Sequence, residues 1–175
     1  MSPHKQIKIR RGALSLLELI TAAAITSSLM TASLVVVRSS YEAWRLHDAE
    51  AEAADQTYAV LRHIVRSLRQ AQAVTAITGP TDDAGEMSLI SVSGDRVAYI
   101  LTGSGVVEYW LNNESTNTKL AHGLTGLTFQ GLAADGVSTA QSPGDVQAVR
   151  ILAAYNSGFG EAGRTVTCLA WMRSW

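Results

Sequence analysis

The side chains that most often carry acid–base or metal chemistry are sparse in this 175-residue chain. Its histidines are His4, His47, His63 and His122. His47 and His63 stand 16 positions apart in a stretch that we expect to be helical, about 24 Å along the axis, which is too far to share a metal ion. No Gly-x-Ser-x-Gly or other nucleophile motif is present. The sequence therefore predicts that the protein is not an enzyme.

Metal and redox chemistry have equally weak support. Asp82, Asp83 and Glu86 cluster in an expected loop and could bind Ca²⁺, but their spacing matches no known calcium loop, so we interpret them as a solvated turn. The single cysteine, Cys168, excludes an intramolecular disulfide framework and a multi-cysteine zinc site. It lies in an alternating strand pattern, which predicts a small buried side chain. We expect no metal and no cofactor.

One carboxylate stands where a charge is costly. Glu18 is the only charged residue in residues 14–37, where 16 of 24 residues are apolar and seven are Ser or Thr. A carboxylate in a membrane span costs roughly 2.5–3.5 kcal/mol unless a partner compensates it or the side chain reaches the headgroups. A basic block with no acid precedes this run: Lys5, Lys8, Arg10 and Arg11. A basic block before an apolar run indicates a secretory signal peptide, a signal anchor or a related leader.

Residues 10–20 read Arg-Arg-Gly-Ala-Leu-Ser-Leu-Leu-Glu-Leu-Ile. This resembles the class III leader of type IV prepilins and type II secretion pseudopilins. The resemblance implies a leader of residues 1–13, cleavage by prepilin peptidase between Ala13 and Leu14, and N-methylation of Leu14. It also implies that Glu18, as the fifth mature residue, assists filament assembly. Cleavage after Gly12 is the alternative, because Gly usually precedes the cut in that family.

Residues 14–37 are long enough to cross a membrane, since 24 helical residues reach about 36 Å and a bilayer core is about 30 Å thick. The preceding basic block predicts a cytoplasmic N-terminus and an extracytoplasmic, periplasmic C-terminal domain. We therefore expect a single-pass protein of the inner membrane that later enters a filament. In the filament, the Glu18 carboxylate would pair with the α-amine of a neighbouring subunit.

Residues 38–77 are predicted to continue the helix as an amphipathic half, because residues 39–73 contain no Gly or Pro. An apolar stripe repeats at three- and four-residue spacing: Ala54, Tyr58, Leu61, Val65 and Leu68. Arg62, Arg66 and Arg69 mark another face, which is either solvated or contacts an acidic partner. Thr78-Gly79-Pro80 is predicted to end the helix.

Residues 78–175 are predicted to form a β-rich globular domain. Strand-like runs bounded by turn residues occupy residues 87–92, 96–102, 106–111, 124–130, 146–153 and 165–172. Three successive hairpin-type connections favour an antiparallel meander. The predicted fold class is α+β, with a long N-terminal helix packed on the meander, and by resemblance it is pilin-like.

This order of elements is similar to the larger minor pseudopilins of the J type and to minor pilins of the W type. The resemblance implies a structural subunit whose partners are other pseudopilins or pilins, prepilin peptidase, an inner-membrane assembly platform and, before assembly, membrane lipid. The alternatives are a signal-anchored periplasmic binding domain and a competence-type minor pilin that contacts DNA through Arg62, Arg66 and Arg69. Fourteen basic and fifteen acidic residues give a net charge of −1, which excludes a broad basic surface, so we expect no nucleic-acid partner.

Overall fold

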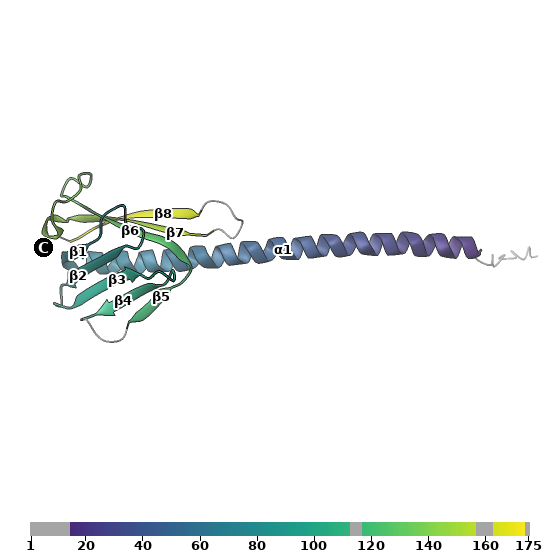
Figure 1. The fold of residues 1–175 in the computed structure, drawn as a ribbon, viewed down its shortest axis with the longest axis horizontal. Coiled ribbons are helices and arrows are strands. Elements are labelled where there is room, and N and C mark those ends of the chain that lie inside the picture. Colours follow the sequence, from purple (N-terminus) through teal and green to yellow (C-terminus); the bar gives the residue numbers. More distant parts are fainter. Residues whose placement is uncertain (1–14, 113–116, 157–162, 174–175) are drawn as a thin grey trace, which may run out of the picture. The chain divides into compact units, whose positions relative to one another are not determined.

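The computed structural model describes residues 15–112, 117–156 and 163–173. Within these ranges one long helix, α1 (Leu16–Arg69), precedes eight strands and a short 3₁₀ helix, η1 (Pro143–Asp145), as Figure 1 shows. The chain divides into two compact units, Met1–Trp44 and Arg45–Trp175. A long N-terminal helix followed by antiparallel sheets confirms the predicted α+β class.

The strands form two sheets, and every pairing is antiparallel between strands that are consecutive in the sequence. The first sheet has the order β1 (Ala71–Ile77), β2 (Glu86–Ser91), β3 (Arg96–Leu101), β4 (Val107–Leu111) and β5 (Thr118–Ala121). The second has the order β6 (Leu124–Leu132), β7 (Ala148–Tyr155) and β8 (Arg164–Trp171). All six predicted strands are confirmed to within two residues at each end.

The predicted helix end is wrong. Residues 38–77 do not stay helical to the end: α1 stops at Arg69, and Ala71–Ile77 form β1. The Gln70 N–H bonds the Ser67 carbonyl at 3.0 Å and tightens the last turn, while the Gln70 carbonyl accepts from Val92 N–H at 2.9 Å. Val74 and Ala71 are buried in β1, so pairing with β2 outweighs the helix preference of this Ala- and Gln-containing segment.

The predicted antiparallel meander is confirmed for β1–β5, but the chain leaves this first sheet between β5 and β6 and forms a second sheet. Gly123, with φ +82°, makes this turn in a conformation that favours glycine. The sheets remain joined by backbone hydrogen bonds, from Gly85 N to Leu127 O at 2.8 Å and from Leu127 N to Asp83 O at 2.9 Å. A side chain on Gly85 would collide with the Leu127 carbonyl, so this close approach requires glycine. The strand β5 was not predicted from the sequence.

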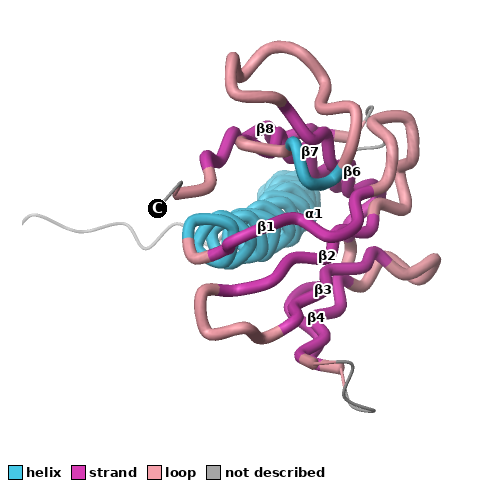
Figure 2. The backbone as a smooth tube through the Cα atoms, turned by 90° about the vertical axis from the view of Figure 1, so that its left-hand side faces the viewer, coloured by secondary structure: helices cyan, strands magenta, loops and turns pink. Residues whose placement is uncertain are grey.

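The core of the Arg45–Trp175 unit lies between the C-terminal turns of α1 and both sheets, which pass on different sides of the helix in Figure 2. Tyr99 from the first sheet and Phe129 and Ile151 from the second are fully buried there. The helix contributes Thr57, Val60, Leu61, Ile64 and Leu68. The buried face is therefore rotated from the predicted stripe, of which Leu61 and Leu68 are buried and Tyr58 is half exposed. Thr57 tolerates burial because its hydroxyl bonds the Ala53 carbonyl at 2.8 Å.

Candidate functional site

The first turn of α1 holds Glu18 in a reciprocal cap with Ser15. The Glu18 carboxylate accepts from the Ser15 backbone N–H at 3.0 Å and from the Ser15 hydroxyl at 3.3 Å. The Ser15 hydroxyl in turn accepts from the Glu18 N–H at 3.2 Å. This is a capping box, in which two backbone N–H groups that have no partner within the helix are satisfied. The Ser-x-x-Glu spacing is the sequence signal for such a cap, whereas Glu18 was predicted only as an assembly residue.

The predicted processing site lies outside the described residues. Both residues of the predicted cut, Ala13 and Leu14, belong to residues 1–14, as do the leader and the predicted N-methylation position. Cleavage and methylation therefore stay predictions. The nearest described residue is Ser15, which Glu18 caps.

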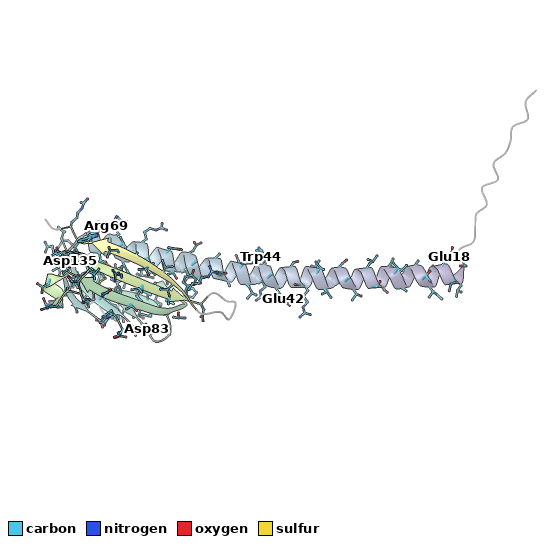
Figure 3. All side chains as sticks on the ribbon, turned by 90° about the horizontal axis from the view of Figure 1, so that it is seen from above. Glu18, Glu42, Trp44, Arg69, Asp83 and Asp135 are labelled. Atoms are coloured by element: carbon cyan, nitrogen blue, oxygen red, sulfur yellow. The ribbon has the colours of Figure 1, made fainter. Side chains whose placement is uncertain are left out.

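Side chains project outward all along the first part of α1, as Figure 3 shows from Glu18 to Trp44. Residues 16–44 are all exposed in the isolated chain. This is the one helix in the described part of the chain that is long and apolar enough to cross a membrane. Exposed apolar surface of this extent marks a site that other apolar groups cover.

The hydroxyls in this segment bond to the backbone of α1 itself. Six of them donate to carbonyls three or four residues earlier at 2.8–3.0 Å: Thr21, Thr26, Ser27, Ser28, Thr31 and Ser33. The sequence left open whether they satisfy the local backbone or serve close helix packing. The structure shows the local bonds, so each hydroxyl already has its partner within α1.

A polar and aromatic border follows the apolar segment. Arg38 and Glu42 form an exposed ion pair at 3.0 Å, one helical turn apart. The rings of Tyr41 and Trp44 are tilted against each other with their centroids 6.4 Å apart, and about three-fifths of each residue is exposed. Tyrosine and tryptophan concentrate where hydrocarbon meets the headgroups, and arginine can extend its charge toward water. These residues fit the C-terminal boundary of a segment that is long and apolar enough to cross a membrane.

The three predicted helix arginines, Arg62, Arg66 and Arg69, are exposed. They line a cavity of about 340 Å³ together with Arg173, which follows β8. None of the three forms an ion pair within the described residues. The sequence placed these arginines on one helix face, but only the fold brings Arg173 to them.

The helix and the first sheet are fixed to each other by a buried tyrosine. The Tyr99 hydroxyl donates to the Ser67 hydroxyl at 2.7 Å and lies 2.9 Å from His63 Nδ1. Tyr109 packs edge-on against His63 at a ring-centroid distance of 5.2 Å. Burial, and then the positive charge of Arg66, lower the pKa of His63, while burial raises the pKa of Tyr99. Both pKa shifts favour the neutral side chains of His63 and Tyr99, which together form a contact between α1 and the first sheet.

The acidic loop predicted as a solvated turn is exposed. Asp82 Oδ1 accepts from the Ala84 backbone N–H at 3.0 Å and so stabilises the turn itself. Within the described ranges no group of three or more His, Cys, Asp and Glu residues could hold a metal ion. Cys168, predicted to be buried, is half-buried against the core, and burial raises the pKa of its thiol.

Comparison with known proteins gives no relative. No protein-family model, no curated protein and no solved structure matches this chain. The geometry of the described residues is therefore the basis for a functional proposal.

Proposed function

We propose that this chain is a structural minor pseudopilin or minor pilin of a type II secretion or type IV pilus assembly. The observation that carries the proposal is the composition of α1. Its residues 16–37 are apolar and exposed, and the C-terminal turns of the same helix pack against the two sheets. The apolar part would anchor the subunit in the inner membrane, with its N-terminus in the cytoplasm, and later pack among the helices of other pilin-like subunits. The sheets would remain in the periplasm.

Glu18 would supply the charge interaction between subunits. Its carboxylate lies at the start of α1, within 3.0 Å of the Ser15 N–H, which is one residue from the proposed new amine of Leu14. That α-amine would be cationic near neutral pH. Within an apolar bundle, the carboxylate and the amine of an adjacent subunit would each reduce the desolvation cost of the other. Prepilin peptidase and an inner-membrane assembly platform would act before this step.

The direct test is the mass of the N-terminal peptide after co-expression with an active prepilin peptidase. We expect the mature protein to begin at Leu14 and to carry one added methyl group. A peptidase inactivated at its catalytic site is the control and should leave residues 1–13 in place. A chain that keeps its leader with the active peptidase would refute the proposal.

The capping box favours one rival, a signal-anchored periplasmic binding domain. In that protein Glu18 would only cap α1, and no filament would exist. Two variants separate the roles. Glu18→Gln keeps a cap-competent side chain but removes the charge, whereas Ser15→Ala weakens the cap and keeps the charge.

A filament subunit should lose assembly with Glu18→Gln and keep most of it with Ser15→Ala, measured by cross-linking to neighbouring subunits. An anchored domain should show no cross-linking to such subunits in either variant or in the wild type. Loss of assembly in Ser15→Ala alone would mean that Glu18 acts through the helix cap.

A further inference from the structure

Three cavities adjoin one another at the C-terminal end of α1. The first, of about 340 Å³, is the one that the three helix arginines line. The second, of about 430 Å³, shares Arg69, Gln70 and Arg173 with it and adds residues 91–93. The third, of about 510 Å³, shares Arg173 and Val92 with the second and extends along Gln72 and Ala73 of β1. Together they form one groove, which we call the arginine groove.

The charge of the arginine groove has one sign. Arg62, Arg66, Arg69 and Arg173 line it, and no Asp or Glu is among the described residues that line any of its three cavities. Arg62, Arg66 and Arg69 have no ion-pair partner within the described residues. Burial lowers the pKa of His63, and the positive charge of Arg66 lowers it further. Such a groove favours an anionic ligand.

The wall of the groove favours a peptide among the anionic ligands. β1 is the edge strand of the first sheet: it pairs with β2, and residues 71–77 make no backbone hydrogen bond to any other segment that the structure describes. Because η1 and β6 lie beside β1, an added chain can reach this edge only where it lines a cavity. Gln72 and Ala73, at the start of β1, line the third cavity. An extended chain can add to such an edge through main-chain hydrogen bonds, with alternate side chains reaching neighbouring pockets.

We propose that the arginine groove binds an extended acidic peptide segment of a partner protein. The peptide backbone bonds the start of β1 at Gln72 and Ala73, which line the third cavity, and its Asp or Glu side chains lie over Arg62, Arg66 and Arg69. This deepens the proposed function, on which it rests only for the identity of the partner, a neighbouring pilin-like subunit. All residues that line the groove belong to the Arg45–Trp175 unit.

The test uses the full-length protein in non-ionic detergent and a fluorescent ten-residue peptide of alternating Glu and Val. Fluorescence anisotropy gives the Kd at low and at physiological ionic strength. We expect saturable binding that weakens with salt, because exposed charges are screened beyond about 8 Å at physiological ionic strength. The double variant Arg66→Gln/Arg69→Gln should weaken binding about tenfold, as expected for two lost charge contacts.

Matched controls separate charge, strand addition and misfolding. Arg45→Gln/Arg96→Gln removes two exposed arginines outside the groove and should leave the Kd unchanged. A Gln-and-Val peptide should bind at least tenfold more weakly, as should a Glu-and-Val peptide with N-methylated backbone amides. Far-UV circular dichroism should be the same for all variants.

Equal binding by the groove variant, by the Gln peptide or by the N-methylated peptide would overturn the proposal. Tighter binding of a ten-nucleotide single-stranded DNA than of the acidic peptide would also overturn it and would assign the groove to phosphate. An unprocessed N-terminus with normal peptide binding would refute the filament function but not the groove. A processed N-terminus with no peptide binding would refute the groove proposal but not the filament function.

Discussion

Ile25 and Ile64 are the same amino acid in the same helix, but 59% of Ile25 is exposed in the chain and none of Ile64. The difference lies in what covers them. Residues 57–68 of α1 pack against sheets of the same chain, whereas residues 16–37 are all exposed in the part of the chain that the structure describes. An apolar helix surface is stable only where water is excluded. The second part of α1 therefore needs only its own domain, and the first part needs lipid or other helices.

The largest expected difference between the two parts concerns stability. Ile64→Ala should lower the free energy of unfolding of the packed domain by about 2–5 kcal/mol, because it leaves a cavity in a full core. The matched variant Ile25→Ala should change it by less than about 0.5 kcal/mol. Urea denaturation in detergent, followed by near-UV circular dichroism, measures both. Equal effects would mean that the two isoleucines share one folding unit.

Membrane insertion should depend on residues 16–37 of α1 and not on the turns of α1 that pack against the sheets. Ile25→Arg should cost roughly 2.5–3.5 kcal/mol of insertion free energy and move protein from the membrane to the soluble fraction. Ala59→Arg, at an exposed position of the second part, should leave the distribution unchanged. Alkaline carbonate extraction of membranes followed by immunoblotting measures the partition. Retention of Ile25→Arg at the wild-type level would contradict a membrane role for residues 16–37.

The hydrogen bonds of Tyr99 should contribute less than the apolar core. Tyr99→Phe removes the hydroxyl that bonds Ser67 and contacts His63, and should lower the free energy of unfolding by about 0.5–1.5 kcal/mol. Tyr58→Phe is the control, since Tyr58 is half exposed. Urea denaturation at neutral pH measures both variants. A larger loss from Tyr58→Phe would show that the exposed face of α1 is covered in solution.

The smallest expected effect is a pH dependence of the free energy of unfolding that arises from His63, in the part of α1 that packs against the sheets. The pKa of His63 is lowered from 6.5, so the unfolded chain binds the proton more tightly than the folded one. This stabilisation is complete above pH 6.5 and is lost as the pH falls through the lower pKa of the folded state. The free energy of unfolding should thus decrease on acidification below pH 6.5, and the decrease should be smaller in His63→Phe. An identical pH profile in that variant would contradict this origin.

The sequence predicted the elements better than their assembly. Short alternating runs with turn residues between them define β2–β4 and β6–β8, because both signals are local. The end of α1 was not predictable in the same way, because residues 70–77 contain no Gly or Pro and become a strand only by pairing with β2. The division into two sheets depends on the turn at Gly123 and on the contact of Gly85 with Leu127, which joins residues far apart in the chain.

The candidate sites, too, were predictable only where their residues lie close together in the sequence. Glu18 was singled out by its isolation in an apolar run, and Ser15 could have been paired with it from their three-residue spacing. Arg62, Arg66 and Arg69 follow from helical periodicity. Arg173 does not, because it reaches the other arginines only through the return of β8 to the end of α1. Sites within one helix can be read locally, and sites between elements cannot.

The back-bonded hydroxyls of residues 21–33 have a consequence for how α1 changes its surroundings. Each hydroxyl donates to a carbonyl of α1 itself. Transfer of this segment from one apolar environment to another therefore need not break any of these hydrogen bonds. The free energy of such a transfer then depends mainly on van der Waals packing and on the lipid that is displaced, both of which vary gradually with the surroundings. The segment is thus suited to exchange neighbours reversibly, as a solute moves between two similar solvents.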